Sequence, residues 1–100
     1  MRLSREVTCM ILEIARRQFG DAISVWLFGS RVDDMRRGGD IDLLVEVRNP
    51  VDNKPVEAAR FAAALQWQLG DQKIDVIIDD GRNHQLVHEI ARREGILLRC

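Results

Sequence analysis

Tyrosine is absent from this chain of 100 residues, and cysteine and proline occur only twice each. Any reaction on a tyrosine side chain would therefore have to use a tyrosine of another molecule. The two cysteines, Cys9 and Cys100, fit no Cys/His spacing of a metal site, so we expect both to be reduced thiols. Reduced thiols in turn predict a cytoplasmic protein.

An excess of charge and a long apolar run are absent as well. The 15 basic and 16 acidic residues leave a net charge of −1, which argues against the broad positive field that holds long nucleic acid. No apolar run approaches the ~20 residues of a membrane span, and the chain starts without the apolar stretch of a signal peptide. Because a chain of this length can bury roughly 65% of its unfolded surface, we expect one soluble domain over residues 1–100, without membrane contact.

A glycine–serine turn follows the first strand-forming run. Residues 22–28 are apolar and rich in strand formers, and they end at Gly29 and Ser30. Glycine lets a ligand approach the backbone closely, and a turn of this kind can present successive N–H groups to a triphosphate. We therefore predict that Gly29 and Ser30 bind phosphate.

Two aspartates lie at the start of the next predicted strand, residues 40–47. Strand alternation places Asp40 and Asp42 on the face opposite to Ile41 and the apolar residues in phase with it. Their Cα atoms would be roughly 6.6 Å apart at about 3.3 Å per residue. At that separation both carboxylates can hold two divalent metal ions.

A third carboxylate is expected to complete the metal site, and Asp75 is our prediction. It lies inside the β-branched run 73–78, where an aspartate is unfavourable unless it has a partner or a task. Asp79, beside a turn, is the alternative third ligand. Carboxylate oxygens suit Mg²⁺, and without a cation the clustered charges would repel one another.

The remaining pattern predicts an α+β fold with a mixed β-sheet. A helix is expected between Ser4 and Gly20, a second from Pro55 to Gly70, a third from Asn83 to Gly95, and a short strand over 96–98. We expect two layers, with the helices packed mainly on one face and the carboxylates on the other. Trp67, the apolar helix surfaces and the sheet edge are then candidate contacts for a partner chain.

The series Gly29-Ser30, nine further residues, Asp40-x-Asp42 and then Asp75 resembles the minimal nucleotidyltransferases of the DNA polymerase β-like superfamily. The resemblance implies that Gly29 and Ser30 hold the β- and γ-phosphates of ATP. It also implies that Asp40 and Asp42 ligate two Mg²⁺ ions and that Asp75 completes the catalytic metal site. Arg31, where the family often has an arginine, would pair with triphosphate oxygens.

The resemblance further implies transfer of AMP to a hydroxyl group. Minimal members of this family often act as antitoxins that adenylylate a tyrosine of a HEPN-type toxin, which is the partner we expect here. A non-catalytic antitoxin that neutralises its partner by binding is the alternative, and transfer to a small hydroxylated molecule is a third hypothesis. Gly39 stands where the family commonly has serine, and Asp33 and Asp34 add negative charge to the loop, which weakens the case for tight nucleotide binding.

Several other residues have simpler interpretations. His84 and His88 are four residues apart but lack further zinc ligands, so we interpret them as surface histidines. Arg92 and Arg93 are interpreted as solvated. We interpret Trp26 and Trp67 as packed in a core or an interface rather than as platforms on which bases stack. Arg36 and Arg37 of the loop would be solvated, or one of them would reach phosphate.

Overall fold

The computed structural model describes residues 4–28, 41–70, 72–82 and 85–100. Helix α1 (Arg5–Phe19) begins after Ser4, whose hydroxyl accepts a hydrogen bond from the Val7 N–H at 3.2 Å. It ends at Gly20, which has a φ of 95° that side chains other than hydrogen disfavour. Both ends agree with the cap and the stop predicted from the sequence.

Within the described residues, four strands form one mixed sheet, as predicted. They are β1 (Ile23–Phe28), β2 (Ile41–Val47), β3 (Ile74–Asp79) and β4 (Ile96–Leu97), in the order β3-β2-β1-β4. Strand β1 is antiparallel to β2 and β4, whereas β2 and β3 are parallel. A parallel pair needs a long crossover connection, and α2 provides it.

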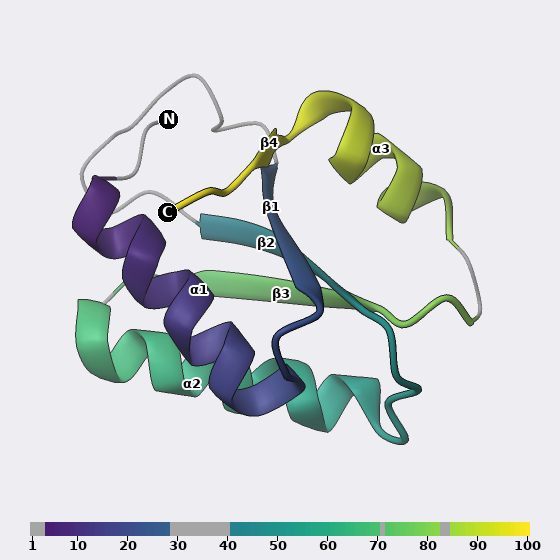
Figure 1. Cartoon of the computed structure of the whole chain (residues 1–100), viewed down its shortest axis with the longest axis horizontal. Helices are drawn as coiled ribbons and strands as arrows, with labels where there is room; N and C mark the ends of the chain where they lie inside the picture. Colours follow the sequence, from purple (N-terminus) through teal and green to yellow (C-terminus); the bar gives the residue numbers. More distant parts are fainter. Residues whose placement is uncertain (1–3, 29–40, 71, 83–84) are drawn as a thin grey trace.

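Helix α2 (Lys54–Leu69) lies between β2 and β3 in the chain and packs beside α1 on one face of the sheet (Figure 1). Asn53 caps it by accepting a hydrogen bond from the Val56 N–H, and Gly70 ends it. The core lies between these two helices and the sheet. Its largest fully buried side chains are Ile11, Val25, Ile41, Leu43, Val45, Phe61 and Leu65.

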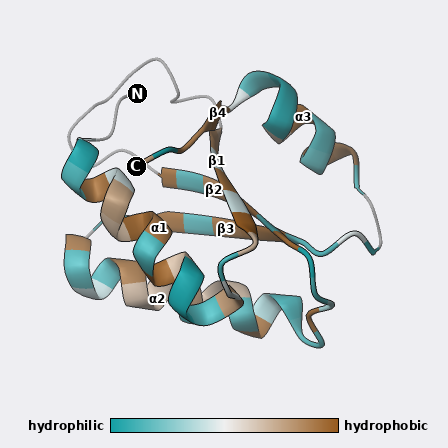
Figure 2. Cartoon of the chain, viewed as in Figure 1, coloured by the Kyte–Doolittle hydropathy of each residue, from teal (hydrophilic) through white to brown (hydrophobic). Residues whose placement is uncertain are grey.

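Helix α3 (Leu86–Glu94) contacts the opposite face of the sheet. The side chains of Glu46 and Asp79, which Arg92 of α3 reaches, alternate with the core residues of β2 and β3. The alternation is visible as brown and teal bands along both strands (Figure 2). Two helices thus cover one face and one covers part of the other. Helix α3 begins later than predicted: Gln85 is its N-cap, and the expected start at Asn83 lies outside the described residues.

A disulfide joins Cys9 in α1 to Cys100, with a Cα–Cα distance of 5.0 Å. The expectation of two reduced thiols was therefore wrong. The two residues are 91 positions apart in the chain, so no local pattern indicated that folding would bring them together. Over the described residues, the helices include none that is long and apolar enough to cross a membrane.

Candidate active site on the open face of the sheet

Asp42 and Asp75 lie directly beside each other on neighbouring parallel strands. In the register of β2 and β3, Asp42 is the partner of Asp75, and on its other side Asp42 pairs with Phe28, the last residue of β1. Adjacent strands are about 4.8 Å apart, and the two side chains point to the same face because paired residues share a face. The structure thus brings together two carboxylates that are 33 residues apart in the sequence (75 − 42).

The position of this pair agrees with the alternation predicted for both strands. Ile41, Leu43 and Ile74 face the core, while Asp42 is partly buried and Asp75 is exposed on the other face. An aspartate is unfavourable inside a strand, and two neighbouring carboxylates repel each other unless a cation is shared. The donor chemistry fits a hard divalent cation such as Mg²⁺.

The other predicted site residues lie outside the described part of the chain. These are Gly29, Ser30, Arg31 and Asp40, with Arg36 and Arg37 in the same stretch. The described strands set the two ends of this stretch: β1 ends at Phe28 and β2 begins at Ile41, beside it in the sheet. Within the described residues, no group of three or more metal-ligating side chains gathers. The assignment of Asp40, Asp42 and Asp75 as metal ligands remains a prediction.

Asp79 lies on the same face as Asp75 but is occupied by other partners. It pairs in register with Glu46 rather than Asp42, and its Oδ2 accepts a hydrogen bond from Arg92 at 2.9 Å. Burial by itself would raise the pKa of Asp79. The hydrogen bonds from Arg92 and from the Gly81 N–H, together with the nearby positive charge, lower it overall. Of the two candidates for a third ligand, only Asp75 lies beside Asp42.

Arg92 connects α3 to the middle of the sheet. Its Nη1 atom donates to Glu46 Oε2 at 2.7 Å as well as to Asp79, and the other oxygen of Glu46 accepts a hydrogen bond from Trp26 Nε1 at 2.6 Å. The pKa of Arg92 is raised, mainly by the hydrogen bond to Asp79. The interpretation of Arg92 as solvated was therefore wrong. Helical spacing accounts for its position, since it lies one turn after the buried His88, on the side of α3 that faces the sheet.

His88 is buried rather than exposed, contrary to the interpretation from the sequence. Its relative exposure is 2%, and its Nδ1 atom accepts a hydrogen bond from the Gln85 N–H at 3.4 Å and lies 3.5 Å from Asp79 Oδ2. The residue occupies the first turn of α3, on the side that faces β3. Trp67 has a relative exposure of 88%, so of its two predicted roles, core packing was wrong.

Just after β3, Asp80 joins two segments of the chain. Its carboxylate accepts hydrogen bonds from the backbone N–H groups of Val51 and Arg82 and forms an ion pair with Lys54 at 2.9 Å. These contacts hold the pKa of Asp80 well below its usual range, with the Val51 N–H contributing most and Lys54 next. The network links the segment before α2 to the segment after β3, away from Asp42.

The family model described as "Nucleotidyltransferase domain" matches residues 8–98. The chain therefore belongs to the nucleotidyltransferase domain family. The match covers most of α1, the four strands of the described sheet and the candidate site. Among curated proteins, none matches this chain.

Several solved structures with the same fold are described as toxin–antitoxin complexes. A toxin–antitoxin structure with AMP-PNP has a TM-score of 0.73 and 23% identity over 97% of this chain and 73% of that one. The MntA-HepT toxin–antitoxin structure has a TM-score of 0.70 and 21% identity, over 96% of this chain and 72% of that one. The structure of a tri-AMPylated HEPN toxin of Shewanella oneidensis in complex with its MNT antitoxin has a TM-score of 0.69 and 21% identity, over 96% of this chain and 72% of that one. At these identities the likeness is one of fold.

Proposed function

We propose that this nucleotidyltransferase-family protein is an antitoxin that transfers AMP from ATP to a hydroxyl group of a HEPN-type toxin, with Mg²⁺ as the cofactor. The observation that carries the proposal is the register of Asp42 with Asp75. It gives the sheet a pair of carboxylates on the face that α1 and α2 leave uncovered. Membership of the nucleotidyltransferase domain family supplies the reaction class.

In this proposal, some residues would bind the metal ions and others would bind the triphosphate. Asp42 and Asp75, with Asp40 from the undescribed loop, would hold the metal ions, and Gly29, Ser30 and Arg31 would hold the triphosphate. When bound, Mg²⁺ supplies charge neutralisation and a lower pKa for a coordinated hydroxyl. The acceptor oxygen forms a bond to the α-phosphorus, the bond from that phosphorus to the bridging oxygen breaks, and pyrophosphate leaves. The hydroxyl proton of the acceptor passes to solvent, and the electrons of the broken bond leave with pyrophosphate.

The proposed acceptor is a tyrosine of the partner toxin. The chain has no tyrosine, so it cannot be the acceptor through that side chain itself. The structure of the Shewanella oneidensis complex, which has the same fold, contains an AMPylated HEPN toxin bound to its MNT antitoxin. A HEPN-type toxin is therefore the substrate to test first, beginning with the product of the neighbouring gene.

The test combines the purified protein with that toxin, Mg²⁺ and ATP labelled on the α-phosphate. We expect label on the toxin, release of pyrophosphate, and loss of both on chelation of the metal. Asp42→Asn and Asp75→Asn should each lower the labelling rate by about a hundredfold or more, because each removes a charged ligand from the site. Asp52→Asn, an exposed position in the loop before α2, is the matched control and should label normally.

The same variants separate catalysis from simple neutralisation. If Asp42→Asn still binds the toxin but no longer suppresses its toxicity, neutralisation requires the transfer reaction. A variant that binds and neutralises fully without labelling would contradict the proposal and favour the non-catalytic antitoxin. Absence of label with the unchanged protein would also contradict it.

A further inference from the structure

The Cys9–Cys100 disulfide lies at the surface of the molecule rather than in its core. Cys100 is exposed and Cys9 is half-buried, and neither belongs to the cluster of buried side chains between the two helices and the sheet. A thiolate from solvent can attack an exposed disulfide, and exposed disulfides are the ones that small thiols reduce most readily. The bond is therefore open to thiol–disulfide exchange.

The segment that this bond anchors is short. Strand β4 (Ile96–Leu97) pairs with β1 over two residues, and a further hydrogen bond runs from the Leu98 N–H to the Val25 carbonyl at 2.9 Å. The buried side chain of Leu98 also supports the segment. Cys100 follows two residues later and joins it to α1, beside which the chain ends (Figure 1). Because so short a pairing adds little stability by itself, the disulfide is an important part of its attachment.

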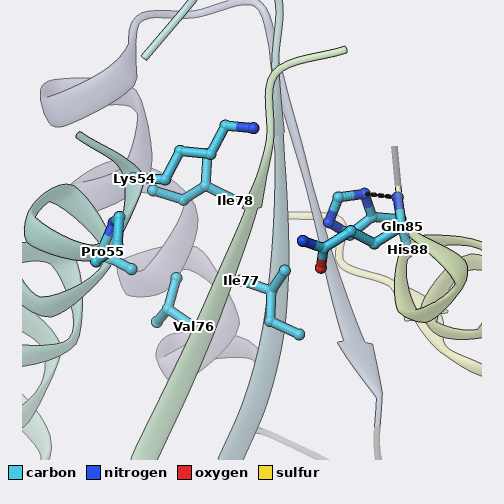
Figure 3. A pocket seen from close by; sticks show the side chains of 8 residues that line it. Lys54, Pro55, Val76, Ile77, Ile78, Gln85 and His88 are labelled. Atoms are coloured by element: carbon cyan, nitrogen blue, oxygen red, sulfur yellow. Dashed lines mark hydrogen bonds between the residues drawn. The ribbon is translucent and has the colours of Figure 1, made fainter. Parts of the chain in front are cut away.

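Helix α3, which precedes β4, is held by contacts of its own. His88 in its first turn is buried beside β3 and accepts a hydrogen bond from the Gln85 N–H (Figure 3). Arg92 donates to one carboxylate of β2 and one of β3. None of these contacts uses residues 96–100. Breaking the disulfide would therefore loosen the segment after α3 without releasing the helix.

The same segment lies against the end of β1 that leads into the predicted phosphate turn. Strand β4 pairs with the two residues of β1 directly before Phe28. Gly95 packs so closely on this end that an added Cβ atom would lie 3.1 Å from Phe28 Cβ. Phe28 in turn pairs with Asp42 and precedes Gly29. The attachment of β4 thus bears on the strand end that links the two parts of the candidate site.

We propose that Cys9 and Cys100 form a reversible redox switch. In the oxidised protein the disulfide pins β4 against β1, and in the reduced protein β4 is released and nucleotide binding at the neighbouring site weakens. The effect on nucleotide binding rests on the proposed function, whereas the release of β4 does not.

The reductant is a low-molecular-weight thiol such as glutathione. Its thiolate attacks the exposed sulfur of Cys100, a mixed disulfide forms there, and Cys9 leaves as a thiolate that takes up a proton. A second thiolate attacks the sulfur of the attached reductant, the mixed disulfide breaks, and Cys100 leaves and takes up a proton. Two small thiols thus become one small disulfide, and two electrons and two protons pass to the protein. A small disulfide reverses the same steps.

The first measurement counts the thiols of the intact protein. The protein is equilibrated in buffers with stepped ratios of reduced to oxidised glutathione, quenched with iodoacetamide and weighed by mass spectrometry. We expect one transition, from no alkylated cysteine to two, that is fully reversed when the protein is returned to oxidised glutathione.

Amide hydrogen exchange, followed by NMR in low concentrations of urea, then tests whether β4 is released. In the reduced protein the Leu98 N–H should exchange at least about tenfold faster than in the oxidised protein, at a rate that hardly changes with urea, as local opening requires. The Phe61 N–H of the buried α2 face is the internal reference. Its exchange should keep the urea dependence of global unfolding.

Titration with AMP-PNP and Mg²⁺ measures the consequence at the site. If only the form with β4 in place binds, a reduced protein that releases β4 for about two thirds of the time or more should bind at least about threefold more weakly. Cys9→Ser/Cys100→Ser should match the reduced protein in both buffers. Arg99→Ser changes the exposed residue next to Cys100 and keeps the bond, so it is the matched control and should switch like the unchanged protein.

Three results would count against the switch. A disulfide that stays intact in reduced glutathione, or whose loss leaves the Leu98 N–H as protected as before, would overturn it. Equal affinity for AMP-PNP in both states, with normal labelling of the toxin, would overturn the regulation and leave AMP transfer standing. If neither state binds AMP-PNP, the proposed function fails, and the exchange of the Leu98 N–H alone decides whether reduction releases β4. The reduced unchanged protein supplies these results even if the double variant does not fold.

Discussion

Arg92 holds two carboxylates from different strands with one guanidinium group. Its partners, Glu46 and Asp79, are neighbours in the register of β2 and β3, and without a cation they would repel each other. The side chain of Arg92 is 27% exposed and that of Glu46 is 32% exposed, so solvent screens part of the attraction. The bridge matters at the residue scale because it fixes α3 on the face that carries Asp42 and Asp75.

We expect Arg92→Met to lower the free energy of unfolding by about 2 kcal/mol. This is the usual contribution of a hydrogen bond to a charged group when solvent screens part of the attraction. The pKa of Asp79 should rise in the same variant, because its main stabilising partner is lost. Urea denaturation and NMR titration of the carboxylate measure the two effects. Arg93→Met, at an exposed position, is the control and should change stability by no more than about 0.5 kcal/mol. Equal losses in both variants would contradict the role of the bridge.

The acid sensitivity of the fold follows from Asp79 and Asp80. Both have a pKa below the ordinary value of 3.8 in the folded state. Their contribution to stability is therefore fully present above pH 3.8 and is lost as the pH falls through the folded pKa values. We expect the urea midpoint to fall steeply below pH 3.8. Asp80→Asn should be less stable at neutral pH, and its urea midpoint should change less with pH in acid than that of the unchanged protein. A pH profile parallel to that of the unchanged protein would contradict the assignment.

At the scale of elements, apolar periodicity predicted most of the fold. The alternation in residues 40–47 and 73–78 indicated which side of each strand faces the core, and the stripe that contains Phe61 and Leu65 indicated α2. The pairing of β2 with β3 could not be read in the same way, because register depends on how two distant strands pack together. The placement of Asp42 beside Asp75 was consequently a hypothesis until the register was known.

The turn from α3 into β4 depends on Gly95. A Cβ atom at this position would lie 2.7 Å from the Leu27 carbonyl oxygen and 3.1 Å from Phe28 Cβ, and closer still to the Ala91 carbonyl oxygen. Gly95→Ala should therefore lower the free energy of unfolding by about 1–3 kcal/mol, the usual cost of overpacking. Chemical denaturation measures the loss, and Glu94→Ala, an exposed neighbour, should be close to neutral. A stable Gly95→Ala protein would mean that the turn can shift.

For the whole molecule, the feature that sequence patterns missed is the Cys9–Cys100 disulfide. Its cysteines are 91 residues apart, and a bond that closes so long a loop restricts the unfolded chain strongly. We expect the oxidised protein to be more stable than the reduced one by about 2–4 kcal/mol. Urea denaturation with and without a thiol reductant measures this difference. The Cys9→Ser/Cys100→Ser double variant should not respond to the reductant, and equal stability of the oxidised and reduced forms would contradict the expectation.

The same disulfide determines how the molecule would respond to stretching. Tension applied through residues before Cys9 and at Cys100 would travel across the two sulfur atoms, because α1 and the last residue are joined there. The sheet and the Asp42–Asp75 pair would then carry no force while the bond is intact. Single-molecule pulling should record a short, stiff extension for the oxidised chain and the full unfolding length only after reduction.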